Sequence, residues 1–303
     1  PGAHPRGDGL MLASLGAELL KLRKRPSTWV LGCIWLAVTI LLNYTLAYAL
    51  LSNAPPPTVP EGTPKAQREQ LREQQEEFRE QQLEFLYPEN LVSNLTPGFA
   101  NLGAPIALIL GALAVGSEYG WTTFKTVLTQ RPGRLALFFG KLLALGILLA
   151  LLVVLTFAAG AASGYVIAGL ENAPAGWPAA GELASAIGAG GLILAVWAAL
   201  GVLLATLLRS TALSIGIGLV YSLVLETIIF SLPIPNEAFR NAREYFPGQN
   251  STFLADSFSG QTQTGFAPPE PPVDASQAAL VLLAYAAAFI LLAALVFGRR
   301  DVT

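Results

Sequence analysis

Long apolar runs separated by short polar stretches dominate the chain. A helix that crosses a membrane needs about 20 mostly apolar residues. Six stretches meet this requirement, at residues 29–51, 99–115, within 135–170, 183–208, 212–232 and 278–297. The third is long for one crossing but contains no turn signal, so we expect one tilted helix with a cytoplasmic extension. The pattern therefore predicts an all-α, polytopic membrane protein with six transmembrane helices.

The fourth and fifth runs are separated only by the tripeptide Arg-Ser-Thr at residues 209–211. Without this break, the apolar run would be about twice the length of one bilayer crossing. A tight turn between two antiparallel helices is the simplest interpretation.

Charge fixes the expected orientation. Only 13% of the 303 residues are charged, against about 25% in soluble proteins. Cytoplasmic loops of membrane proteins carry an excess of Lys and Arg. With the N-terminus inside, 12 of the 18 Lys and Arg residues fall on the inner side, in short basic connections. We therefore expect both termini to be cytoplasmic.

Residues 1–28 are expected to form a cytoplasmic tail that contains an interfacial amphipathic helix. Its apolar stripe consists of Leu12, Leu15, Leu19 and Leu22, and the polar residues placed off the stripe are Glu18, Lys21 and Arg25. This spacing is typical of a helix that lies in the membrane interface. Pro26 argues against a helix that continues into the first span, although a simple cytoplasmic start to that span is the alternative. Residues 1–10 are treated as an extension outside the fold.

The transmembrane domain is assigned to residues 29–303 and carries two large external regions. The first, at 53–96, starts with a proline-rich linker and continues as a polar helical arm. Leu71, Phe78 and Phe85 repeat every seven residues there, but a solvated surface helix explains the arm better than a coiled coil does. The second region, at 231–277, is amphipathic in its first half and predicts short extracellular helices before span six.

Several chemistries are excluded by the composition. The single cysteine, Cys33, lies in an apolar run, and the single histidine, His4, lies near the N-terminus, so we predict no metal site and no catalytic residue. The formal net charge of −2 gives no reason to expect nucleic acid as a partner. The sequence contains no G-x-x-x-x-G-K-[ST] motif, because Leu142 follows Lys141 where Ser or Thr is required. We therefore expect no ATP hydrolysis by this chain alone.

Three polar residues inside the predicted spans are candidates for a substrate path. Glu226 is the only carboxylate within a span, and an ionisable residue inside a membrane is a functional-site hypothesis by default. A helix-end partner or contact with water is the competing explanation. Asn43 and Tyr44, in the outer half of the first span, are similar but weaker candidates.

The stretch between the second and third spans resembles the permease subunit of type-2 ABC exporters. The resemblance is carried, in order, by Ser117, Glu118, Tyr119, Gly120, Trp121, Thr122, Thr123, Lys125, Arg131, Pro132, Arg134, Gly140 and Lys141. Further similar segments are "ELLKLRKRPSTW", "LGVLLATLLRSTALSIGIGLVYSLVLE", "REYFPGQNSTFLADSF" and "FGRRDV", and together they cover most of the chain. The external arm is longer than a minimal member of the family would have.

The resemblance implies a coupling helix at 117–134 that docks on a separate ABC ATPase subunit. The implied coupling residues are Glu118, Tyr119, Gly120, Trp121, Thr122, Thr123, Lys125, Arg131, Arg134 and Lys141. Two permease copies or homologues would pair in the lipid bilayer. ATP and Mg²⁺ would be bound by the partner, and this chain would bind no cofactor. Plain positive-inside anchoring is the alternative role for Lys125, Arg131 and Arg134.

Two other functions remain open at this stage. An ion-coupled secondary transporter would be expected to carry intramembrane charges in several spans or a repeated half. A non-transporting membrane scaffold or sensor would use the external arm. The apolar span faces favour a lipophilic or amphiphilic cargo such as a drug, antimicrobial peptide or lipid, and the resemblance implies multidrug-type export across a bacterial plasma membrane.

Overall fold

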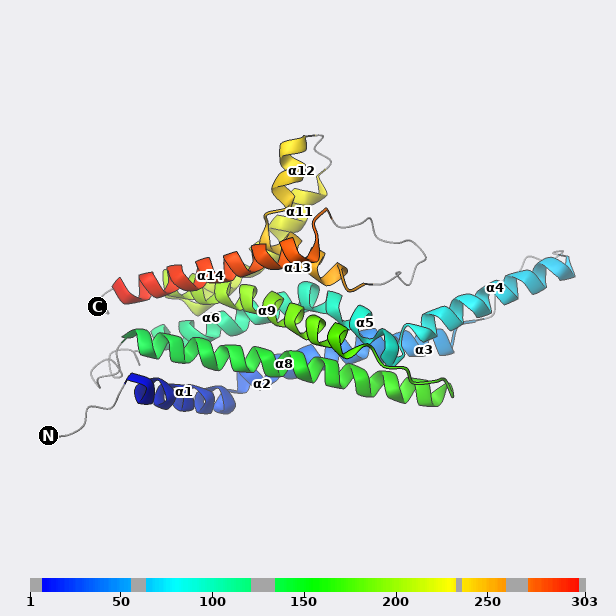
Figure 1. Ribbon diagram of the computed structural model, residues 1–303, viewed down its shortest axis with the longest axis horizontal. Helices are drawn as coiled ribbons and strands as arrows, with labels where there is room; N and C mark the ends of the chain where they lie inside the picture. Colours follow the sequence, from blue (N-terminus) through cyan, green and yellow to red (C-terminus); the bar gives the residue numbers. More distant parts are fainter. Residues whose placement is uncertain (1–6, 56–63, 121–133, 233–235, 260–271, 300–303) are drawn as a thin grey trace.

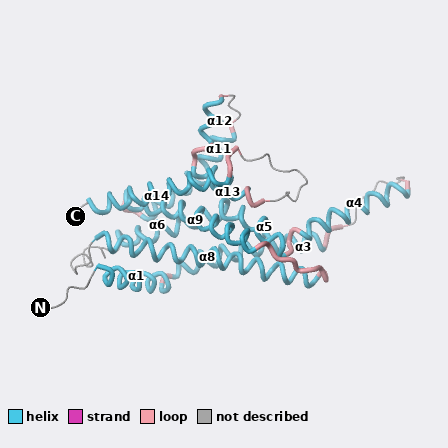
Figure 2. The backbone as a smooth tube through the Cα atoms, in the orientation of Figure 1, coloured by secondary structure: helices cyan, strands magenta, loops and turns pink. Residues whose placement is uncertain are grey.

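The described part of the chain folds into helices alone. The computed structural model describes residues 7–55, 64–120, 134–232, 236–259 and 272–299, and these contain no strand (Figures 1 and 2). Six helices are long and apolar enough to cross a membrane: Pro26–Ser52, Pro88–Ser117, Leu135–Leu170, Ala180–Leu208, Thr211–Ser231 and Ala275–Arg299. The prediction of an all-α protein with six spans is confirmed.

Three spans contain a π-helical segment. Span one consists of α2 (Pro26–Ile40), the π segment Leu41–Leu46 and α3 (Ala47–Ser52). Span two joins the 3₁₀ turn Pro88–Asn90, α5 (Leu91–Gly98), the π segment Phe99–Gly103 and α6 (Ala104–Gly120). Span five joins α10 (Thr211–Val220), the π segment Tyr221–Leu225 and α11 (Glu226–Ser231). Spans three, four and six are the single helices α8 (Arg134–Leu170), α9 (Ala180–Leu208) and α14 (Ala275–Arg299).

Span two begins earlier than the predicted start at residue 99. Pro97 lies inside α5, where its missing N–H would normally interrupt a helix. The π segment that follows re-spaces the backbone hydrogen bonds, so the helix continues through the proline. Asn94 and Thr96 of α5 are buried, and Thr96 donates its hydroxyl to Val92 O at 2.6 Å. The last residues of the range 53–96 therefore belong to the helix bundle.

The third span and the turn after the fourth agree with the sequence-based predictions. α8 is one unbroken helix of 37 residues, about 55 Å long, which exceeds the thickness of the hydrocarbon core. α9 ends at Leu208, and the next residue, Arg209, has a left-handed backbone (φ 52°). The Ser210 side chain then accepts a hydrogen bond from Leu213 N at 3.4 Å and starts α10.

α9 is the centre of the bundle and packs against α6 on one side and α14 on another (Figure 1). Two glycines let α6 and α9 meet backbone to backbone. A Cβ atom on Gly111 would collide with Ala198 O, and one on Gly201 would collide with Leu108 O. Such close approach is typical of small-residue packing between membrane helices.

In the described ranges, four helices lie outside the spans. α1 (Gly7–Lys24) packs along the first part of α8, and the start of α1 and the end of α14 lie at the same end of the bundle (Figure 1). α4 (Lys65–Glu84) extends away from the bundle beyond the opposite end of α8, largely exposed. The predicted short helices before span six are α12 (Glu237–Arg243) and α13 (Pro247–Asp256).

Candidate functional site

A buried ion cluster joins α1 to α8. Glu18 on α1 is only 6% exposed, and its Oε1 atom accepts from Lys21 Nζ at 2.7 Å and lies 3.1 Å from Lys141 Nζ. Lys141, on the first part of α8, is 3% exposed. An interaction between buried charges needs this kind of close, multiple pairing, because an unpaired charge away from water is costly. The amphipathic pattern placed Glu18 on the polar side of the helix, whereas the structure places it on the face that packs against α8.

The two ammonium groups keep the Glu18 carboxyl charged. Burial raises the pKa of Glu18, but the opposing charge of Lys141 and then the contacts with Lys21 outweigh burial and hold the pKa below its ordinary value. At neutral pH the cluster is therefore a carboxylate between two cations. The cluster therefore ties α1 to the start of α8.

Two further hydrogen bonds fix the position of the non-helical residue between α1 and α2. The chain leaves the helical region at Arg25 (φ −83°, ψ 118°), as expected before Pro26. Arg25 Nη1 donates to Leu113 O of α6 at 3.2 Å, and Trp29 Nε1 donates to Arg23 O at 2.7 Å. α1 is thus connected to spans one and three, and the residue that follows it, Arg25, to span two.

The ATPase-coupling residues inferred by resemblance lie in the sequence between the end of α6 and Lys141 of the cluster. Glu118, Tyr119 and Gly120 form the end of α6, and Arg134 starts α8. Trp121, Thr122, Thr123, Lys125 and Arg131 lie outside the described residues, so the predicted coupling helix stays a prediction. Lys141 is the member whose side chain is described, and it faces Glu18 rather than solvent.

A second buried carboxylate, Glu226, joins span five to α13. Glu226 is 3% exposed, and its Oε2 atom accepts from Gln249 N at 3.1 Å. Gln249 lies in the first turn of α13, where backbone N–H groups have no partner within the helix. The positive end of the helix dipole favours a carboxylate there. Glu226 therefore caps α13 from a different part of the chain.

Gly248 makes this capping contact possible. A Cβ atom on Gly248 would overlap the Glu226 carboxylate. Tyr221 lies beside the same carboxylate, because the π segment that starts at Tyr221 brings residue 226 back over it. Glu226 Oε1 has no hydrogen-bond partner among the described residues.

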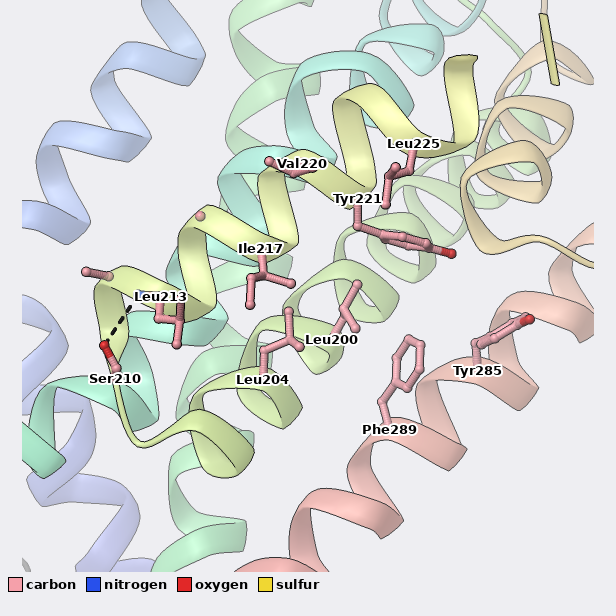
Figure 3. Close-up of a pocket in the computed structure, with 12 residues that line it drawn as sticks. Leu200, Leu204, Ser210, Leu213, Ile217, Val220, Tyr221, Leu225, Tyr285 and Phe289 are labelled. Atoms are coloured by element: carbon pink, nitrogen blue, oxygen red, sulfur yellow. Dashed lines mark hydrogen bonds between the residues drawn. The ribbon is translucent and has the colours of Figure 1, made fainter. Parts of the chain in front are cut away.

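An apolar groove of about 920 Å³ begins next to this junction. It lies between span five, α9 and α14, and its lining includes Leu213, Ile217, Tyr221, Leu225, Leu200, Leu204, Tyr285 and Phe289 (Figure 3). The hydroxyl groups of Tyr221 and Tyr285 point toward the same end of the groove (Figure 3). Such a surface suits an apolar molecule or an apolar helix face, with the two hydroxyls as polar contacts.

The other two substrate-path candidates lie away from this groove. Asn43 and Tyr44 belong to the π segment of span one. Tyr44 is 2% exposed and faces Gly160 of α8, where a Cβ atom would lie 2.9 Å from its hydroxyl oxygen. Tyr44 thus packs two spans together.

The described residues contain no group of three or more His, Cys, Asp or Glu side chains that could hold a metal ion. The described residues instead form two junctions, each built on a buried glutamate that ties a helix outside the spans to a span, and an apolar groove. Together with the six apolar spans, these features define a multi-pass helical membrane protein.

Comparison with known proteins places the chain in a family. The family model described as ABC-2 family transporter protein matches residues 12–302, nearly the whole chain. The protein belongs to this family, and it is an ABC-2 type permease. A search among curated proteins gave no match.

Proposed function

We propose that the protein is the membrane subunit of an ATP-driven exporter, in which two permease copies or homologues pair and two separate ABC ATPases bind at the end that carries α1. ATP and Mg²⁺ would be bound by the ATPases. The family match over residues 12–302, together with six spans, carries this proposal.

The ion cluster supports a specific route for coupling. The segment between α6 and α8 would contact the ATPase, together with Glu118 at the end of α6. Lys141 follows Arg134 by two turns of α8, so a displacement of this segment would reach Glu18 and move α1 as well. The inferred coupling role of Lys141 is therefore to position α1, because its ammonium group is buried.

The exposed surface of span five supports the proposed pairing of permeases, and the groove beside it supports the proposed class of substrate. It is one of the least buried spans, and Leu213, Val220 and Leu223 are each about half exposed. A second permease copy, or lipid, would cover this face. The apolar groove beside it favours a lipophilic or amphiphilic substrate, in the plasma membrane of a bacterium.

The test is co-expression with the ABC ATPase encoded beside the gene, purification of the complex, and an ATPase assay after reconstitution. We expect a stable complex whose ATPase activity depends on this subunit, and we expect Glu118→Ala to uncouple that activity from export. Wild-type export by Glu118→Ala would remove Glu118 from the coupling mechanism. Failure to bind any ABC ATPase would reject the exporter and favour a scaffold that uses α4.

A further inference from the structure

A slot at the junction of α1, α2 and α8 has a basic group at one end and apolar walls along the rest. It has a volume of about 340 Å³, within the range of small-molecule sites of about 300–1,000 Å³. Its walls come from Leu19, Leu22, Trp29, Gly32, Cys33, Leu36, Ile147, Leu148, Leu151, Leu152 and Leu155, with Thr28 and Arg23 as the polar members. Among the described residues that line it, Arg23 is the charged one.

The slot is formed by the break in the chain at Arg25. α1 ends and α2 starts in a new direction, so the two helices cannot both lie flat on α8. Gly32 widens the gap, because a Cβ atom there would still be 4.0 Å from the nearest side chain, that of Leu152. The slot lies beside Trp35, whose Nε1 donates to Thr156 Oγ1 at 2.7 Å and holds α2 against α8.

The basic end is electrostatically suited to an anion. The last turn of α1 contains Lys21, Arg23 and Lys24. Backbone carbonyl groups at a helix C-terminus normally repel anions. Here Lys21 O and Leu22 O accept from Arg25 N, and Arg23 O accepts from Trp29 Nε1. Lys21 is paired with Glu18, so Arg23, which is exposed and lines the slot, is the cation placed to meet a ligand.

The apolar end is suited to a hydrocarbon chain. Trp29 is 56% exposed, and Ile147, Leu151 and Leu155 are also exposed along the α8 side. An exposed Trp next to a cluster of cations is typical of the headgroup level of a bilayer. The slot therefore continues from the headgroup level into the hydrocarbon region.

We propose that this slot binds one anionic glycerophospholipid from the surrounding leaflet, with its phosphate at Arg23 and an acyl chain between α2 and α8. Apolar walls alone would accept any lipid, and the cation selects the anionic class. The bound lipid would fill the angle between α1 and α2 and so fix the position of α1. The site would exist whether or not the protein is an exporter.

The single cysteine of the chain, Cys33, lines the slot and is exposed, so its reaction with N-ethylmaleimide reports occupancy. The full-length protein in detergent is titrated with phosphatidylglycerol, phosphatidylcholine or inorganic phosphate. We expect phosphatidylglycerol to slow the modification at concentrations where the other two have no effect. Equal protection by phosphatidylcholine would reject the role of charge, and equal protection by inorganic phosphate would reject the lipid.

Arg23→Gln and Lys24→Gln form a matched pair, because both remove one cation from the same turn and only Arg23 lines the slot. We expect Arg23→Gln to weaken phosphatidylglycerol binding about fivefold, as estimated for one basic group near a membrane surface, and Lys24→Gln to have a smaller effect. Equal effects of the two would mean that only general surface charge attracts the lipid, which overturns the proposed site.

Gly32→Leu tests the apolar half by a second readout. A leucine side chain would occupy the slot, so fewer phosphatidylglycerol adducts should survive in native mass spectrometry of this variant than of the wild type. Thermal unfolding shows whether each variant is folded. An unchanged number of retained lipids in folded Gly32→Leu would place the lipid elsewhere and contradict the proposal.

Discussion

Glu18 and Glu226, the two buried carboxylates among the described residues, are held by different kinds of partner. Glu18 and Glu226 are 6% and 3% exposed, and each ties a helix outside the spans to a span. Glu18 is bonded to two ammonium groups on side chains, whereas Glu226 accepts from the backbone of α13. A charge partner can be lost by one substitution, but a backbone partner can be lost only if the helix itself moves. The α1 junction is therefore sensitive to side-chain chemistry and the α13 junction to shape.

The strongest test of this difference is Lys141→Met. The substitution leaves the Glu18 carboxylate buried, with Lys21 as its remaining ammonium partner among the described residues. Removal of one member of a buried ion pair lowers the free energy of unfolding by about 3–5 kcal/mol. We expect the free energy of unfolding to fall by about 3 kcal/mol, the lower end of this range, because Lys21 stays in place. The measurement is thermal unfolding in detergent, with proteolysis of α1 as a local readout.

The matched controls for Lys141→Met are Lys21→Met and the double variant Glu18→Leu/Lys141→Met. Lys21 is 38% exposed at its side chain, so its loss should cost at most about 1 kcal/mol. The double variant removes both charges and should recover most of the stability. If it is as unstable as Lys141→Met alone, the buried carboxylate is not the cause.

Gly248→Ala is the corresponding test of shape at α13. The added methyl group would overlap Glu226, and such overpacking costs about 1–3 kcal/mol. We expect faster hydrogen exchange in α13 and a lower unfolding temperature. Gly191→Ala is the control, because a Cβ atom there meets nothing within 4 Å. Equal effects of both variants would contradict a specific contact at Gly248.

Acid should loosen the α1 junction. The pKa of Glu18 is lowered in the folded protein, so its stabilising effect is present above the unfolded pKa of about 4.3 and is lost as the pH falls through the lower folded pKa. We expect α1 to become more susceptible to a protease active in acid below about pH 4, with a smaller effect than that of Lys141→Met because the neutral carboxyl still accepts hydrogen bonds. Glu18→Gln should abolish the Glu18 contribution to this pH dependence, and an unaltered acid transition in that variant would assign it to other groups.

Glu226→Gln should have the smallest effect on stability. The amide keeps the shape of the side chain and an oxygen that accepts from Gln249 N, so the change should stay within about 1 kcal/mol. An export assay of this variant tests whether Glu226 only caps α13 or also forms part of a substrate site. Intact export leaves Glu226 with the structural role, whereas loss of export at unchanged stability would make it part of the substrate path.

Sequence reasoning worked best where composition decides the outcome. The six spans, the turn at Arg209 and the break before Pro26 follow from apolar length, short polar interruptions and proline geometry. The earlier start of span two was not predictable in the same way. Pro97 signals an interruption in sequence, and the π segment that compensates for it depends on packing.

The candidate sites show the same limit. Glu226 could be singled out because a carboxylate within an apolar run is rare, but its partner, Gln249 N, lies 23 residues away in the sequence. Glu18 was missed because helical periodicity alone does not show that Lys141 on another helix supplies a buried cation. A long-range partner becomes visible only when the helices are placed.

The glycine contacts between α6 and α9 constrain how the bundle can rearrange. At Gly111 and Gly201 the main chains themselves touch, and no side chain can rotate there to let one helix slide past the other. A displacement of the end of α6 would therefore carry α9 with it, and the two helices would move as one rigid unit.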